Sequence, residues 1–169
     1  RDTTQLRMFV SDDFFKTRRA VALDDLPNPR GFVNMGRSDQ FLIAAVQGDD
    51  DELRLYVSRD AETWTRARFP HVVLSHENAY TILEGPKYHL AVDVYDHASR
   101  LDGLFISDST GTNFSLSIAD TVRGADGIID YEHMTHMEGV AIVNVHAAGS
   151  PARVQTRITH DEGASWTDI

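Results

Sequence analysis

Two tyrosines and two glutamates are the residues of this sequence whose chemistry would suit glycoside hydrolysis. That reaction needs either two carboxyl groups flanking the scissile bond or a tyrosine nucleophile with an acid beside it. The candidates are Tyr80, Tyr131, Glu132 and Glu138. Because no spacing among them singles out a catalytic set, we predict no catalytic residue and keep a glycosidase as the alternative interpretation.

Histidines and an acidic run are the candidates for metal ligands. His133 and His136 have a ligand-like spacing, but that spacing brings side chains to one face only on a helix, and the surrounding residues favour strand and turn. The run Asp49-Asp50-Asp51-Glu52 could give oxygen ligands to calcium or form the solvated tip of a hairpin. We favour the hairpin tip, and we expect neither a metal nor another cofactor.

A pH-dependent role is a separate hypothesis for the histidines. Imidazole titrates close to neutral pH, so protonation in an acidic compartment could weaken a contact with a ligand. Four of the eight histidines fall close together in the sequence: His71, His76, His89 and His97.

Composition narrows the class of protein. The chain has 169 residues, 41% of them hydrophobic, so it can bury a core. Its formal net charge of −10 repels phosphate backbones and anionic lipid, which argues against partners such as nucleic acid or a membrane surface. It has no cysteine, and therefore no disulfide or thiolate metal site. Its apolar runs are too short to span a bilayer, and because it begins at Arg1 without a methionine or leader, we expect an excerpt of a longer chain.

A polar turn that recurs about every fifty residues is the strongest pattern. Its pattern is (Ser/Thr)-x-Asp-x-Gly-x-(Ser/Thr)-(Trp/Phe), where x is any residue. We number the copies as the first to the fourth turn. Their expected structural residues are, in order, Ser11 and Asp13; Ser58, Asp60 and Trp64; Ser107, Gly111 and Phe114; and Thr159, Asp161, Gly163 and Trp166.

The chemistry of this turn is structural. Asp and hydroxyl side chains accept hydrogen bonds from nearby backbone N–H groups, Gly supplies a positive φ, and the aromatic side chain buries itself against the hairpin. The fourth turn is complete, whereas the second is one residue short and the third has Ser109 at the position of the Asp. One such turn would mean little, but its repetition predicts a repeat fold.

Short apolar strands lie at nearly constant distances from these turns. Phe41–Val46, Leu90–Val94 and Val140–Val145 precede three of the turns, and further strand candidates flank them. Four short strands per repeat are typical of a propeller blade. We therefore predict an all-β fold in which residues 1–169 form part of a larger β-propeller domain. Residues 31–70 and 79–119 would be whole blades, 1–23 the end of an earlier blade, and 128–169 the start of the next.

One local motif bears on modification. Asn113-Phe114-Ser115 fits the acceptor pattern for N-glycosylation. The triplet also occurs by chance, and Asn is common in tight turns. Asn113 is therefore either a glycosylation candidate or an ordinary turn residue.

The four turns resemble the Asp box, or BNR repeat, of sialidases and sortilin-type receptors. Several segments are similar to the sortilin family, above all to its fungal members that carry carboxypeptidase Y to the vacuole: Glu77–Pro86, Tyr88–Val94, Gly103–Phe114, Gly139–Val145 and Arg157–Trp166. The resemblance implies a non-catalytic receptor with a lumenal propeller, commonly ten-bladed, and a transmembrane helix outside this chain. It implies soluble vacuolar or lysosomal hydrolase precursors, or peptides, as partners, bound in the Golgi and trans-Golgi network and released in endosomes.

The resemblance also suggests ligand-facing residues. In animal sortilin, an aromatic residue and an arginine on the strand after one Asp box help to hold a peptide's terminal carboxylate. Phe114 matches the aromatic residue, but Asp120 stands at the position of the arginine, with Arg123 three residues later. That departure argues against the same carboxylate contact, and Phe114, Ser117 and Arg123 are the expected ligand-facing residues. The alternative function is an Asp-box glycosidase, sialidase-like or acting on glucan.

Overall fold

The chain folds entirely from strands and turns. A computed structural model describes residues 6–26, 29–47, 52–74, 79–83, 88–96, 101–125 and 127–169. Within these ranges every regular element is a β-strand, which confirms the expected all-β class. The same ranges hold no helix long and apolar enough to cross a membrane.

The strands form one two-stranded and three four-stranded antiparallel sheets. The first sheet pairs β1 (Phe9–Val10) with β2 (Arg19–Ala20). The second contains β3 (Phe32–Ser38), β4 (Phe41–Gln47), β5 (Leu53–Ser58) and β6 (Thr65–Arg66). The third contains β7 (Tyr80–Leu83), β8 (Ala91–Asp96), β9 (Leu101–Ser107) and β10 (Phe114–Ala119). The fourth contains β11 (Tyr131–His133), β12 (Ala141–Ala147), β13 (Ser150–Thr159) and β14 (Thr167–Asp168). Each four-stranded sheet is a meander, as expected of propeller blades.

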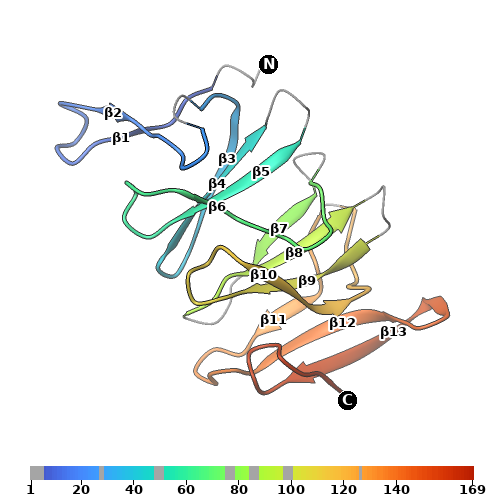
Figure 1. The fold of residues 1–169 in the computed structure, drawn as a ribbon. Coiled ribbons are helices and arrows are strands. Elements are labelled where there is room, and N and C mark those ends of the chain that lie inside the picture. Colours follow the sequence, from blue (N-terminus) through green and yellow to red (C-terminus); the bar gives the residue numbers. More distant parts are fainter. Residues whose placement is uncertain are drawn as a thin grey trace.

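Successive sheets lie side by side in chain order, from the β1–β2 hairpin to β11–β14 (Figure 1). The first strands of the second and third sheets touch, because a Cβ atom on Gly36 of β3 would lie 3.0 Å from Cδ1 of Ile82 on β7. The second, third and fourth turns each connect the third strand of a four-stranded sheet to its fourth strand, and the first turn connects β1 to β2. The turns therefore recur at the same place in every repeat.

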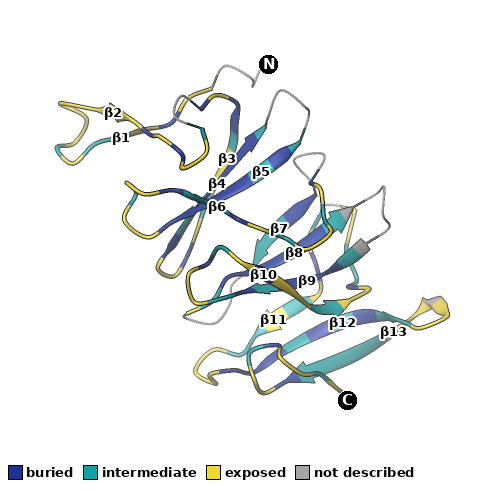
Figure 2. Cartoon of the chain, in the orientation of Figure 1, coloured by how far each residue is buried: buried dark blue, intermediate teal, exposed yellow. Residues whose placement is uncertain are grey.

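The core lies between the sheets, and β4 shows why. Phe41 and Ile43 pack into the cluster shared with the third sheet, whereas Ala44 and Val46 pack on the opposite face toward the first sheet. Successive side chains of a strand point to opposite faces, so a strand covered on both sides must be apolar throughout. Burial accordingly follows the central strands, while most of the first turn and the tips of the β3–β4 and β12–β13 hairpins are exposed (Figure 2).

The last sheet differs from the sequence-based expectation. We expected residues 128–169 to supply only the beginning of a blade. The structure pairs four strands there, because Thr167 and Asp168 after the fourth turn pair with Ile158 and Arg157. A two-residue strand carries too little periodicity to be predicted from sequence.

Candidate functional site

The first and fourth turns share one hydrogen-bonding scheme. In the fourth, the hydroxyl of Thr159 donates to Asp161 Oδ1 (2.7 Å), and Asp161 accepts from the N–H (2.8 Å) and the hydroxyl (2.5 Å) of Ser165. In the first, Asp13 accepts from the N–H (2.9 Å) and the hydroxyl (2.7 Å) of Thr17. The hydrogen bonds from Ser165 lower the pKa of Asp161 to about 2. Such carboxylates close turns and are poorly suited to proton transfer near neutral pH.

The shortened second turn reaches a similar result with fewer residues. Asp60 accepts from the N–H groups of Thr63 and Glu62, each at 2.8 Å, and these bonds lower its pKa to about 2. Ala61 takes a positive φ of 62° and accepts the indole N–H of Trp64 at 3.1 Å. Trp64 is buried and packs in the cluster beneath the first sheet.

The third turn uses a different carboxylate from the one its pattern suggested. Asp108, one residue before Ser109, accepts hydrogen bonds from the hydroxyl of Thr110 (2.5 Å) and the side-chain amide of Asn113 (2.8 Å). Burial opposes ionisation of Asp108, but the bonds from Thr110 and Asn113 outweigh it and lower its pKa. The hydroxyl of Ser107 instead accepts the N–H of Leu90 at 2.7 Å. The repeat pattern did not predict the role of Asp108, because the pattern places the carboxylate at position 109. The signal in the sequence was an Asp adjacent to that position.

We therefore expect Asp108→Ala to lower the free energy of unfolding of the full-length protein by about 1–2 kcal/mol, the range for losing a side-chain cap. Ser109→Ala is the matched control, and because its exposed side chain makes no described contact we expect a change below about 0.5 kcal/mol. Denaturant unfolding measures both. Equal losses, or a larger loss for Ser109→Ala, would show that the carboxylate of Asp108 does not close the turn.

Two residues expected to face a ligand lie between sheets instead. Phe114 is 6% exposed and stacks on Phe69 with 4.4 Å between ring centroids. The hydroxyl of Ser117 donates to the carbonyl of Gly163 (2.5 Å) and accepts the indole N–H of Trp166 (2.9 Å). Both side chains hold the third sheet to its neighbours, a role that depends on contacts between distant parts of the chain.

The third expected residue, Arg123, belongs to a buried ion pair. Its guanidinium donates to Asp93 Oδ2 (2.6 Å) and to the hydroxyl of Thr81 (2.7 Å), and its side chain is 10% exposed. Thr121 donates to the other oxygen of Asp93 at 2.6 Å. Burial raises the pKa of Asp93 to about 6, against the lowering effect of Thr121 and Arg123. The pair ties the segment after β10 to the β7–β8 hairpin.

The candidate hydrolytic residues do not form a catalytic arrangement. Tyr131 and Glu132 are neighbours on β11 and therefore point to opposite faces. Burial raises the pKa of Tyr131 to about 12, which opposes its use as a nucleophile. Tyr80 is buried in the core beside the second sheet, and Glu138 is exposed in the turn before β12.

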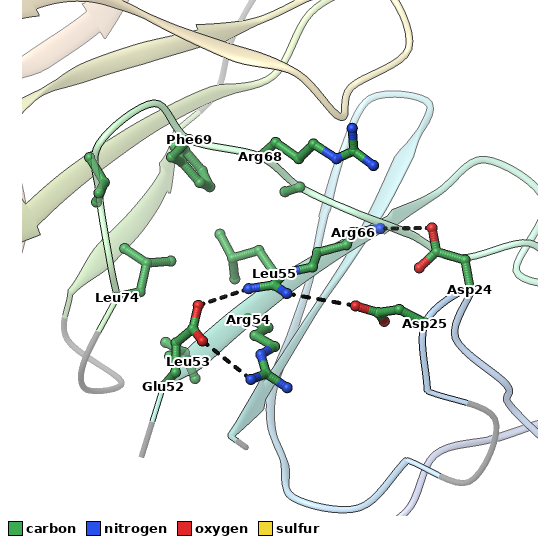
Figure 3. A pocket seen from close by; sticks show the side chains of 12 residues that line it. Asp24, Asp25, Glu52, Leu53, Arg54, Leu55, Arg66, Arg68, Phe69 and Leu74 are labelled. Atoms are coloured by element: carbon green, nitrogen blue, oxygen red, sulfur yellow. Dashed lines mark hydrogen bonds and ion pairs between the residues drawn. The ribbon is translucent and has the colours of Figure 1, made fainter. Parts of the chain in front are cut away.

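A mixed-charge cavity of about 340 Å³ lies beside β5 and β6 (Figure 3). Glu52 binds two arginines in it, Arg66 at 2.8 Å and Arg54 at 3.2 Å. Arg66 also approaches Asp25 at 3.7 Å, and Asp25 accepts the hydroxyl of the buried Tyr56 at 2.7 Å. This network holds the segment after β2 against the second sheet, so the charges of these residues are largely engaged with one another.

The histidines have separate environments. His89 contacts the carbonyl of Ser107 at 2.9 Å and Glu162 at 3.2 Å, whereas His71 is exposed. His76 and His97 lie outside the described residues, as do Asp49–Asp51 of the acidic run. Over the described part of the chain, no three His, Cys, Asp or Glu side chains are grouped so as to hold a metal ion.

Comparison with known proteins gives a consistent result. The family model described as "Sortilin, neurotensin receptor 3" (Sortilin-Vps10) matches residues 1–169. Similar curated proteins are each named "Vacuolar protein sorting/targeting protein 10". They include those of Mycosarcoma maydis, 40% identical over 95% of this chain, Laccaria bicolor, 35% over 96%, and Phaeosphaeria nodorum, 33% over 96%. The chain spans only 11% or 12% of the length of these relatives.

Proposed function

The chain belongs to the Sortilin-Vps10 family, and we propose that it is part of the lumenal cargo-binding domain of a sorting receptor. The receptor would carry soluble hydrolase precursors from the late Golgi to endosomes and the vacuole, anchored by a transmembrane helix outside these residues. The observation that carries the proposal is a family match over residues 1–169, together with relatives named for vacuolar protein sorting. We further propose that the domain is non-catalytic and that the four turns act as Asp boxes.

We place the cargo contacts on the first strand of each sheet. Phe114, Ser117 and Arg123 are engaged between sheets, so their side chains are not available to cargo. In a closed propeller the first strands surround the central channel. Here β3 and β7 already touch, and β3 exposes Met35, with 64% of its surface accessible. An exposed, flexible thioether suits contact with cargo segments of varied sequence.

A charge at this position tests the proposal. In the full-length protein, expressed in a fungal strain that lacks its own receptor of this family, we expect Met35→Glu to increase secretion of a soluble vacuolar hydrolase precursor. Desolvating the new carboxylate in the contact should weaken binding at least about tenfold, equivalent to 1.4 kcal/mol. The fraction of precursor secreted into the medium, measured by immunoblot, reports the effect.

The matched control is Leu116→Glu, which places the same charge on a 45% exposed residue of β10, the fourth strand of the third sheet. It should leave secretion at the wild-type level. If both variants sort cargo normally, the first strands do not contact cargo. If the unmodified protein fails to retain the precursor at all, the sorting function itself is wrong.

A further inference from the structure

An open groove of about 440 Å³ separates the second turn from the third. Its walls are rich in hydroxyl and amide groups, and the side chains used below are Asp60, Thr63, Thr65, Thr112 and Asn113. The guanidinium of Arg59 spans the two turns, donating to the carbonyl of Ser109 and lying 4.9 Å from the centre of the Phe41 ring. The groove is therefore a fixed part of the contact between neighbouring sheets.

Asn113 stands at one wall of this groove and is exposed. Its amide nitrogen Nδ2 carries two hydrogens with different partners. One donates to Asp108 Oδ2 at 2.8 Å, within the third turn. The other makes a marginal contact of 3.5 Å with the hydroxyl of Thr112, a residue of the groove wall. Replacing the second hydrogen would leave the stronger bond intact and direct the new group along the groove.

Asn113 is also the first residue of an Asn-x-Ser triplet, which marks an acceptor for N-glycosylation in lumenal proteins. We propose that Asn113 is N-glycosylated and that the first sugars of its glycan lie in the groove between the second and third turns. This proposal rests on the proposed lumenal function. The sequence supplies the acceptor motif, and the structure adds a groove that can hold the first sugars.

The donor would be a lipid-linked oligosaccharyl diphosphate. A bond forms between Nδ2 of Asn113 and C1 of the sugar, and the bond from C1 to the diphosphate oxygen breaks. The lipid diphosphate leaves as an anion, and one amide proton of Asn113 is released. The remaining N–H stays on Nδ2 and can donate to Asp108 after folding.

The groove offers the polar partners that a saccharide requires. Thr63 and Thr65 line the groove and carry hydroxyl groups that can both donate and accept, and Asp60, whose Oδ1 accepts the N–H groups of its own turn, adds a carboxylate to the lining. Sugar hydroxyls held by such groups replace the bonds they made to water. The glycan should therefore be ordered at its base and shield the contact between the two sheets.

Occupancy is tested on the full-length protein isolated from membranes of the expressing cells. Mass spectrometry of the peptide containing Asn113, before and after peptide N-glycosidase F, should show a glycan on the wild type and none on Ser115→Ala. The Ser115 variant removes the acceptor pattern while keeping the amide bond to Asp108. An unmodified Asn113 in the wild type overturns the proposal.

Protease protection of the same membranes separates this proposal from the proposed function. If the protein is protected in the lumen and Asn113 is bare, only the glycan proposal fails. If the protein is exposed to the cytosol, the receptor function fails, and with it the glycan.

Placement in the groove is tested by the rate at which the same glycosidase releases the glycan from the native protein. We expect the double variant Thr63→Ala/Thr65→Ala to release it about two- to tenfold faster, the factor for losing roughly one net hydrogen bond. Thr17→Ala, which removes a hydroxyl from the first turn, is the control and should release it at the wild-type rate. Equal rates for all three proteins would overturn the placement.

Discussion

Asp93→Asn in the full-length protein is expected to lower the free energy of unfolding by about 3–5 kcal/mol at neutral pH, the largest single effect we expect. The substitution keeps the size of the side chain but removes the charge that faces Arg123 at 2.6 Å. Arg123 would keep its hydrogen bond to Thr81 but lose the charge of the carboxylate that it binds at 2.6 Å, and a guanidinium cannot neutralise itself by losing a proton in proteins. Denaturant unfolding measures the loss.

The complementary substitution is Arg123→Met. Its free energy of unfolding should depend on the titration of Asp93, a group that Asp93→Asn removes. Arg123 lowers the pKa of Asp93, so removing it raises a pKa that burial already places at about 6, above the unfolded value of 3.8. A carboxyl group with a raised folded-state pKa contributes stability that is present below the unfolded pKa and is lost as pH rises through the folded one. Arg123→Met should therefore be less damaging at pH 5 than at pH 8.

The double variant Asp93→Leu/Arg123→Met is the control for this pair. Replacing both charges by apolar groups is often close to neutral, so we expect a stability within about 1 kcal/mol of the wild type. If the double variant is as unstable as Asp93→Asn, the loss comes from packing rather than from the loss of the counter-charge of Arg123. A flat pH response of Arg123→Met would contradict the titration of Asp93 in this range.

The second large effect concerns Gly111, where the third turn meets the second sheet. Gly111 has a φ of +79°, and a Cβ atom there would lie 2.6 Å from Cε1 of Phe41, a ring with 0% exposure. We expect Gly111→Ala to cost about 1–2 kcal/mol for the left-handed conformation and a further 1–3 kcal/mol, roughly, for overpacking the contact. Thermal unfolding of the full-length protein measures the sum.

Gly149 separates these two contributions. Its φ is +72°, but a Cβ atom there would meet nothing within 4 Å. Gly149→Ala should therefore show only the conformational cost of about 1–2 kcal/mol. If the two glycine variants are equally unstable, the close approach of the third turn to Phe41 does not contribute.

The parts of the fold predicted from sequence are those encoded locally. A central strand such as β4 is apolar on both faces, and the fourth turn carries every residue of its motif. Both can therefore be recognised from a few consecutive residues. The family resemblance, based on longer segments, is confirmed by the match over residues 1–169. The strand β14 was missed because two residues give no period.

The roles of single residues were less predictable because they depend on contacts between distant segments. Ser117 meets the fourth turn, and Arg123 meets Asp93. The sequence around each of these two residues does not indicate which distant residue it contacts. The role of Asp108 was missed for a different reason. When the backbone conformation of a turn differs, the carboxylate can come from an adjacent position, here 108 rather than 109.

The central claim is that the longer protein binds soluble hydrolase precursors, and a binding titration tests it most directly. The full-length lumenal domain would be titrated with the precursor of carboxypeptidase Y at neutral and at endosomal pH, by isothermal calorimetry. We predict saturable binding at neutral pH that weakens in acid. Absence of binding at both pH values, in a sample whose unfolding transition is intact, would contradict the receptor function.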